Sequence, residues 1–255
     1  MGKFNVDEFK KKYQNSASMP EVRYTLPISK QEVFYKPITT KQQSAMLKAM
    51  EAKDVKLIEK VLDNIISVNT VDEIDVMNMT MVDRKSLLIN MVTQSIGDKF
   101  DLSLECPECG KNQKMKIDLT KIKDPTISDD KLSKEVTIND YVFTLSIPTR
   151  KKMQAIEDTF DVDDDEKVSV VDIADDLITV VIKSVKGEGI EDEDISYEDS
   201  IELIKTLTPI DLKQIKEYID GLDLDSTNKT MFKCKDKECN YKQEIQIQIT
   251  HLFSK

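Results

Sequence analysis

Short stretches in which apolar and polar residues alternate predict extended segments along the chain. Residues 22–27 and 32–37 each end at a proline, as edge strands do. Residues 136–147 alternate on both sides of Asn139-Asp140, which predicts a β-hairpin closed at that dipeptide.

Apolar residues spaced three and four positions apart predict helices between the extended segments. Thr80, with Asp83 three residues later, forms a start signal like a capping box, and Gly97 ends the helix that it opens. A second start signal is Thr208 followed by Pro209 at the first helical position. The predicted apolar stripes fall in residues 46–50, 57–66, 87–92, 153–156, 170–185, 201–207 and 215–222.

All four cysteines lie at the tips of two further hairpins, which alternation predicts in residues 100–119 and 231–249. They form two close pairs: Cys106 with Cys109, and Cys234 with Cys239. Two thiolates on one tight turn can face one ion, and two such turns supply the four sulfurs of a tetrahedral zinc site. We expect a left-handed residue after each pair, at Gly110 and Asn240, because it turns backbone amides toward the sulfurs. The sequence thus predicts one structural zinc ion in a split ribbon.

Two other interpretations of the cysteines are open. Local disulfides or four unrelated buried thiols fit the spacing, but the doubled hairpin context and the lack of a secretory signal favour a metal. A redox role for Cys106-Pro-Glu-Cys109 is weaker, because a thioredoxin-like dithiol lies at a helix N-terminus and strands flank this pair.

The composition is ordinary for a globular protein of 255 residues, with 39% hydrophobic and 33% charged residues. No segment approaches the ~18 apolar residues of a membrane span, and the N-terminus lacks an apolar signal core. We therefore expect that the protein has no membrane partner and that it is made and kept in a reducing cytoplasm.

The net charge of −11 is concentrated in one acidic region. Residues 157–199 contain 17 acidic residues and three lysines, so the rest of the chain carries about +3. Part of this region, Glu188 to Asp194, is expected to be a flexible surface loop or an electrostatic docking patch. Nucleic-acid binding is disfavoured because it needs a concentrated basic footprint.

The acidic region contains a partial calcium-loop pattern. Asp161, Asp163 and Asp165 stand at positions one, three and five, and Asp172 stands at position twelve. Glu166 occupies the sixth position, where the sharp turn needs glycine, so a solvated acidic loop is favoured over a calcium site.

The sequence contains little material for catalysis. His251 is the single histidine, and the six glycines form no phosphate-binding motif. We therefore predict that the chain is not an enzyme and has no small-molecule substrate.

The order of these segments resembles the baseplate hub protein family of T-even-type contractile-tailed bacteriophages over residues 22–255. The resemblance rests on Leu26-Pro27, on Tyr35-Lys-Pro-Ile-Thr39, on Ser95-Ile-Gly97 before a Cys-x2-Cys-Gly hairpin, on Ile147-Pro148-Thr149, and on a second cysteine hairpin before Leu252-Phe253. The second cysteine pair has four intervening residues instead of two. The resemblance implies a non-enzymatic virion or tail-assembly component, made as a late protein and active at the baseplate.

The predicted fold class is α+β, mainly helical, with extended N-terminal strands and a split four-cysteine zinc ribbon built from two β-hairpins. We expect an N-terminal arm in residues 1–20, followed by an extended segment with helices in residues 21–98. The first half of the ribbon is expected in residues 99–124, and a hairpin and helical insert with acidic loops in residues 125–228. The second half of the ribbon and a C-terminal tail are expected in residues 229–255.

The expected function is a structural or assembly subunit of a phage tail baseplate hub that binds other baseplate or tail proteins. Its expected location is the virion tail baseplate, and the host cytoplasm during assembly. A transient tail-assembly chaperone and a zinc-ribbon nucleic-acid-binding protein are the alternatives. Partner binding is expected at apolar residues left on the surface after the core is built: Tyr24, Leu26, Val33, Phe34, Tyr35, Leu252 and Phe253.

Overall fold

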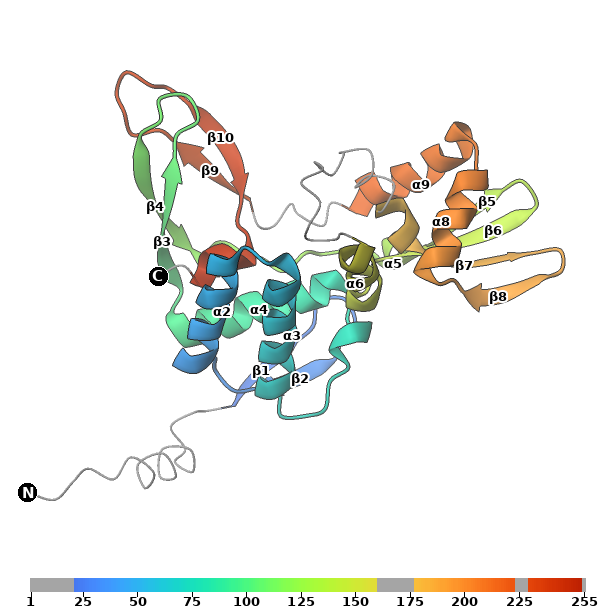
Figure 1. Cartoon of the computed structure of the whole chain (residues 1–255), viewed down its shortest axis with the longest axis horizontal. Coiled ribbons are helices and arrows are strands. Elements are labelled where there is room, and N and C mark those ends of the chain that lie inside the picture. The colour runs from blue at the N-terminus through green and yellow to red at the C-terminus, as the bar shows by residue number, and fades with distance from the viewer. Residues whose placement is uncertain (1–20, 160–176, 223–228, 254–255) are drawn as a thin grey trace, which may run out of the picture.

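The computed structural model describes residues 21–159, 177–222 and 229–253. These residues form a helical body, an α/β lobe and a ribbon of two hairpins (Figure 1). Helices occur with small antiparallel sheets, so the predicted α+β class is confirmed.

The helical body combines a short hairpin with three main helices. Its elements are β1 (Val22–Thr25), β2 (Glu32–Tyr35), α2 (Thr40–Ala52), α3 (Val55–Asn69), the 3₁₀ turn η1 (Val76–Asn78), α4 (Met81–Ile96) and the C-terminal 3₁₀ turn η4 (Ile249–Phe253). The predicted start and end of α4 are confirmed, because the Thr80 hydroxyl accepts from the Asp83 amide and the helix ends at Gly97. Thr39 caps α2 in a capping box with Gln42.

Residues from both ends of the described chain pack together in the core of the body. Leu87, Leu88 and Met91 from α4 are fully buried together with Phe253, which is the last described residue. The ends of the ribbon hairpins that lie away from the cysteines, including Phe100, also pack into this core. The ribbon is therefore anchored at its base by ordinary apolar burial.

The α/β lobe is built on a four-stranded antiparallel sheet of order β5-β6-β7-β8. Its elements are α5 (Asp129–Leu132), β5 (Ser133–Ile138), β6 (Tyr141–Ser146), α6 (Arg150–Thr159), β7 (Ile182–Gly187), β8 (Ile190–Asp194), α8 (Tyr197–Thr206) and α9 (Pro209–Leu222). The predicted hairpin at Asn139-Asp140 is confirmed, and Asn139 takes the left-handed backbone that the turn needs.

Two expectations for the lobe are wrong. Helix was predicted through residues 170–185, but helix is found only in residues 177–181 of the described part, and β7 follows. The inner strand β7 buries Ile182, Ser184 and Val185, and such a run cannot be distinguished from a buried helix by spacing. Glu188 to Asp194 was expected to be a flexible surface loop or an electrostatic docking patch; the loop is wrong, because β8 (Ile190–Asp194) pairs there with β7, and the docking patch stays a prediction.

Two further predictions fall outside the described residues. These are the N-terminal arm, residues 1–20, and the partial calcium loop that begins at Asp161. Within the described ranges, none of the helices combines the length and the apolar character needed to cross a bilayer.

Candidate metal centre

The first cysteine pair lies at the tip of the hairpin formed by β3 (Lys99–Glu105) and β4 (Asn112–Asp118), which continues into the 3₁₀ turn η2 (Leu119–Lys121). We call residues 106–110 the first knuckle. The amide of Cys106 donates to the Lys111 carbonyl at 3.1 Å, and the amide of Gly110 donates to the Cys106 carbonyl at 2.8 Å. Gly110 has a φ of 69°, which confirms the expected left-handed turn.

The second pair lies between β9 (Lys229–Lys233) and β10 (Lys242–Gln246). We call residues 234–240 the second knuckle. Its base closes like that of the first knuckle, since the Cys234 amide donates to the Tyr241 carbonyl at 2.9 Å. The turn inside differs: the Cys239 amide donates to the Asp236 carbonyl, and the Asp236 carboxylate accepts from the Glu238 amide at 2.9 Å. Asn240 does not have a positive φ, so the expected left-handed residue is absent here. The two extra residues of this knuckle let Asp236 organise the turn instead.

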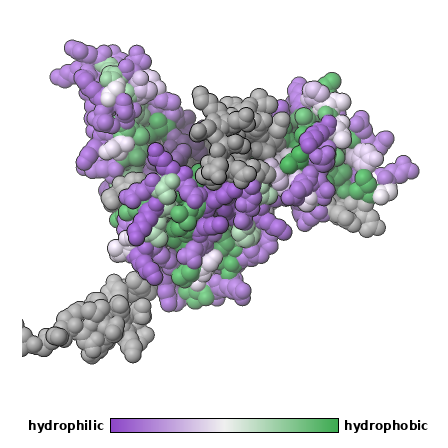
Figure 2. Space-filling view, viewed as in Figure 1, coloured by the Kyte–Doolittle hydropathy of each residue, from purple (hydrophilic) through white to green (hydrophobic). Residues whose placement is uncertain are grey.

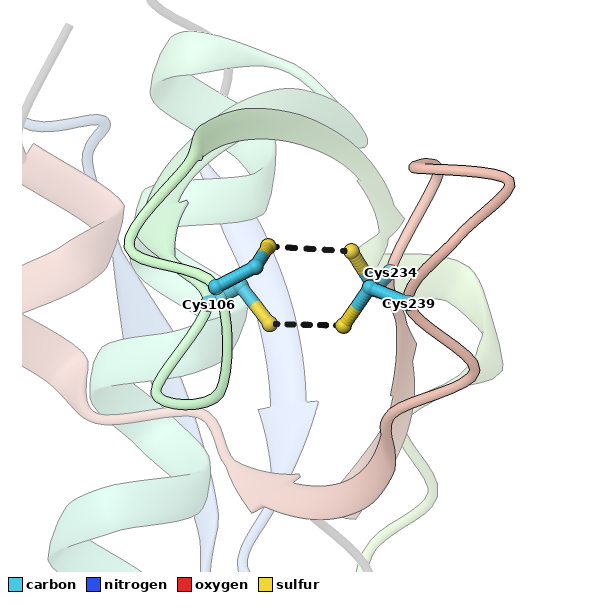
Figure 3. A group of neighbouring side chains, drawn as sticks. Cys106, Cys234 and Cys239 are labelled. Atoms are coloured by element: carbon cyan, nitrogen blue, oxygen red, sulfur yellow. Dashed lines mark hydrogen bonds between the residues drawn. The ribbon is translucent and has the colours of Figure 1, made fainter.

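The two knuckles face each other, and their sulfurs converge from both hairpins (Figure 3). The sulfurs of Cys106 and Cys239 are 3.8 Å apart, and those of Cys109 and Cys234 are 3.7 Å apart. All four sulfurs lie within 4.8 Å of one another. A tetrahedral zinc ion about 2.3 Å from each sulfur places neighbouring sulfurs about 3.8 Å apart. The geometry is therefore compatible with one metal ion shared by both hairpins.

The sulfur distances do not fit the local disulfides considered from the sequence. All four cysteines are free, and the short distances join one hairpin to the other instead of joining the two members of a pair. The unrelated-thiol interpretation also fails, because the four sulfurs meet at one point.

The thiols have opposed ionisation tendencies. Burial opposes ionisation of Cys234, but the Asp236 amide and the Gln113 side chain stabilise its thiolate and lower its pKa to about 7. At Cys239 the Tyr241 amide favours the thiolate, yet burial and the neighbouring sulfurs outweigh it and raise the pKa to about 12. Four thiolates so close together repel one another, and a bound divalent cation removes that penalty.

The ribbon tip has few apolar contacts of its own. Phe232 is the buried aromatic residue of the tip, and its ring lies 6.4 Å from that of Tyr241. The other buried members of this cluster are Cys106 and Cys239 themselves. In the view of Figure 2, hydrophilic side chains predominate on the visible ribbon. A tip this small needs metal ligation or similar cross-links to hold its shape.

The predicted partner-binding residues lie mostly inside the molecule. Exposure is 3% or less for five of them: Leu26, Val33, Tyr35, Leu252 and Phe253. Their expected position as remaining apolar surface is wrong, because the body uses them to complete its core. Tyr24 is half-buried against the same core, and burial raises its pKa. Phe34 is half-buried on the face of β2 opposite Val33 and Tyr35.

A second polar centre, which the sequence did not reveal, joins the body to the lobe. We call it the arginine junction: Arg84 of α4 and Arg150 of α6 with Glu59 and Asp63 of α3 and Glu157 of α6. The two arginine side chains are only 4% and 2% exposed. Burial raises the pKa of Glu157 although Arg150 holds it through two hydrogen bonds. The one sequence signal that could have revealed the junction is Arg84, a charged residue within the apolar stripe of its helix.

Comparison with known proteins identifies a family. The family model described as "T4 bacteriophage base plate protein" matches residues 19–253. Neither the search of curated proteins nor that of solved structures found a match.

Proposed function

The chain belongs to the T4 bacteriophage base plate protein family, and we propose on this basis that it is a structural or assembly subunit of a phage tail baseplate hub. The family match carries the proposal, because it extends over the body, the ribbon and the lobe together. In this proposal the chain binds other baseplate or tail proteins. Its site of action is the virion tail, and it reaches the tail through the host cytoplasm.

We also propose that the metal of the ribbon is zinc. A four-thiolate tetrahedral donor set is typical of structural zinc, and the sulfur distances suit it. Four protein ligands leave no open position on the ion, which favours a structural role over a catalytic one. Membership of a baseplate family supports the same non-enzymatic assignment.

The nucleic-acid alternative receives little support from the ribbon. Single-stranded nucleic acid is bound by exposed aromatic rings beside basic side chains. Phe232 is buried and Tyr241 is half-buried, while Lys111 is paired with Asp236 and Lys235 donates to the Lys114 carbonyl. We therefore propose protein partners.

For the partner-binding surface, we propose an apolar patch around Phe34 on the outer side of the β1–β2 hairpin. Val71 lies beside Phe34, since its amide donates to the Phe34 carbonyl at 2.8 Å. Val71 is 48% exposed. Among the residues predicted to bind partners, Phe34 belongs to this patch, and the core residues only support it.

A matched pair of surface substitutions tests the patch. Val71→Lys should prevent incorporation of the chain into tails without changing its fold or its metal content, because a charge then meets the partner. Val55→Lys is the control, because Val55 is an exposed valine, at 61%, at the start of α3 and outside the patch. Normal assembly with Val71→Lys, or equal failure of both variants, would contradict the patch.

Mass spectrometry of purified tails tests the functional proposal itself. A retained subunit appears in mature particles in a fixed ratio to other baseplate proteins. If the chain is required for assembly but absent from the particles, the chaperone alternative is correct. If it is recovered only with nucleic acid, the baseplate-binding proposal fails.

A further inference from the structure

The two knuckles differ in how they hold their own shape. The first knuckle closes through its own backbone, with amide-to-carbonyl bonds at Cys106 and Gly110. The second knuckle lacks a left-handed residue, and its organising carboxylate, Asp236, also pairs with Lys111 of the first hairpin. The longer knuckle also has backbone bonds of its own, from Cys234 to Tyr241 and from Cys239 to Asp236, and it adds contacts with the opposite hairpin.

Gln113, on β4 of the first hairpin, makes the most specific of these contacts. Its side-chain Nε2 donates to the sulfur of Cys234 at 2.8 Å, and its Oε1 accepts from the backbone amide of Lys235 at 2.6 Å. One amide group thus contacts a cysteine of the second knuckle and the residue that follows it.

The two contacts also fix the orientation of the Gln113 amide. The backbone N–H of Lys235 can only donate, so the carbonyl end of the Gln113 side chain must face it. The NH₂ end must then face the sulfur, which acts as the acceptor. A flipped amide would bring two donors together at Lys235. Gln113 is therefore oriented to stabilise Cys234 as an electron-rich metal ligand.

From this geometry we infer that Gln113 is a positioning residue of the metal centre: it holds Cys234 in place for the ion and locks the second knuckle onto the first hairpin. The inference rests on the proposed four-cysteine metal site. Residues that orient metal ligands commonly change metal affinity by about 10- to 100-fold when they are replaced. Because Gln113 holds a ligand in place, we expect its loss to act mainly on release of the ion.

The experiment measures zinc release from the full-length chain to a coloured chelator. Gln113→Leu removes both hydrogen bonds at similar size, and we expect release about 10- to 100-fold faster with unchanged stoichiometry. Gln113→Glu keeps the shape but presents only acceptors to the sulfur, and it should release zinc faster still. Gln246→Leu, at an exposed position on β10, is the matched control and should behave like the wild type.

Cobalt substitution adds a spectroscopic readout. The thiolate-to-cobalt absorption bands should shift in Gln113→Leu, because the sulfur loses a donor, and they should not shift in Gln246→Leu. If both Gln113 variants release zinc at the wild-type rate and show the wild-type spectrum, the positioning role of Gln113 is overturned, while the metal centre itself stands. A similar rate for Gln113→Glu and Gln113→Leu would indicate simple packing and would also overturn it. A wild-type chain that binds neither metal would overturn the metal centre and this inference with it.

Discussion

At the ribbon tip, β3–β4 and β9–β10 meet around four thiols, whereas at the arginine junction α3, α4 and α6 meet around two arginines and three carboxylates. Both centres join segments that are far apart in the sequence, and both do so with polar groups. The four thiols can only become negative when they ionise, so four thiolates at the tip need a cation from outside. The junction contains both signs of charge, two arginines against three carboxylates, so its charges compensate one another largely within the chain.

This difference separates the conditions under which each region is stable. The ribbon tip should be ordered only when its metal is bound, because its apolar cluster is small. The junction and the body core should be ordered with or without metal, since the core contains many fully buried apolar side chains. Metal removal is therefore expected to act locally.

The largest expected effect is that of Cys109→Ser. Structural zinc binding in small finger peptides is worth about 10–16 kcal/mol at neutral pH, and a lost ligand should forfeit much of it. Because the proposed ion is shared by both hairpins, amide hydrogen exchange should accelerate in β9–β10 as well as in β3–β4, while the body remains protected. Ser103→Ala, on an exposed position of β3, is the control. Faster exchange in the first hairpin alone would mean that the two knuckles do not share an ion.

A smaller effect is expected for Arg150→Met. The substitution leaves Glu157 without its paired arginine and leaves Asp63 with Arg84 alone, and breaking a buried ion pair in this way costs about 3 kcal/mol or more. Chemical denaturation should show the loss, and metal content should be unchanged. Lys205→Ala removes an exposed pair with Glu202 and should change the free energy of unfolding by at most about 1 kcal/mol. Equal effects of the two substitutions would contradict the buried role of the junction.

The smallest effect concerns His251 in η4, at the base of the second hairpin. Burial lowers the pKa of His251 below its usual value. As pH falls below ~6.5, the unfolded chain takes up this proton before the folded chain does, so stability should decrease until the folded pKa is passed. In His251→Gln this part of the pH dependence should disappear. The difference between the two unfolding curves over pH 5 to 8 measures it, and identical curves would exclude a role for His251.

Local patterns predicted the elements whose two faces differ. The cysteine hairpins, the β5–β6 turn and helix α4 all alternate or repeat between a buried and an exposed side, and each was found as expected. The inner strand β7 was missed because burial on both sides removes that contrast. The close spacing within each cysteine pair, together with the preference of zinc for four thiolates, predicted that the four sulfurs lie together.

Features that depend on long-range packing could not be predicted in this way. Leu26 and Phe253 look like apolar surface at the ends of the chain, yet a body of three main helices needs them to close its core. Arg150 follows Pro148-Thr149 at the start of α6, where an arginine is ordinarily exposed. Only the fold places it beside Asp63 of α3. Gln113 has no sequence signal of its own, because its role depends on the opposite hairpin.

The metal content of the intact chain tests the central claim most directly. Native mass spectrometry, combined with elemental analysis of the same sample, should find one zinc ion per chain, and mutation of either knuckle should abolish binding. Two ions per chain, a different metal, or an ion that survives the loss of Cys234 and Cys239 would contradict a single zinc ion shared by the two hairpins.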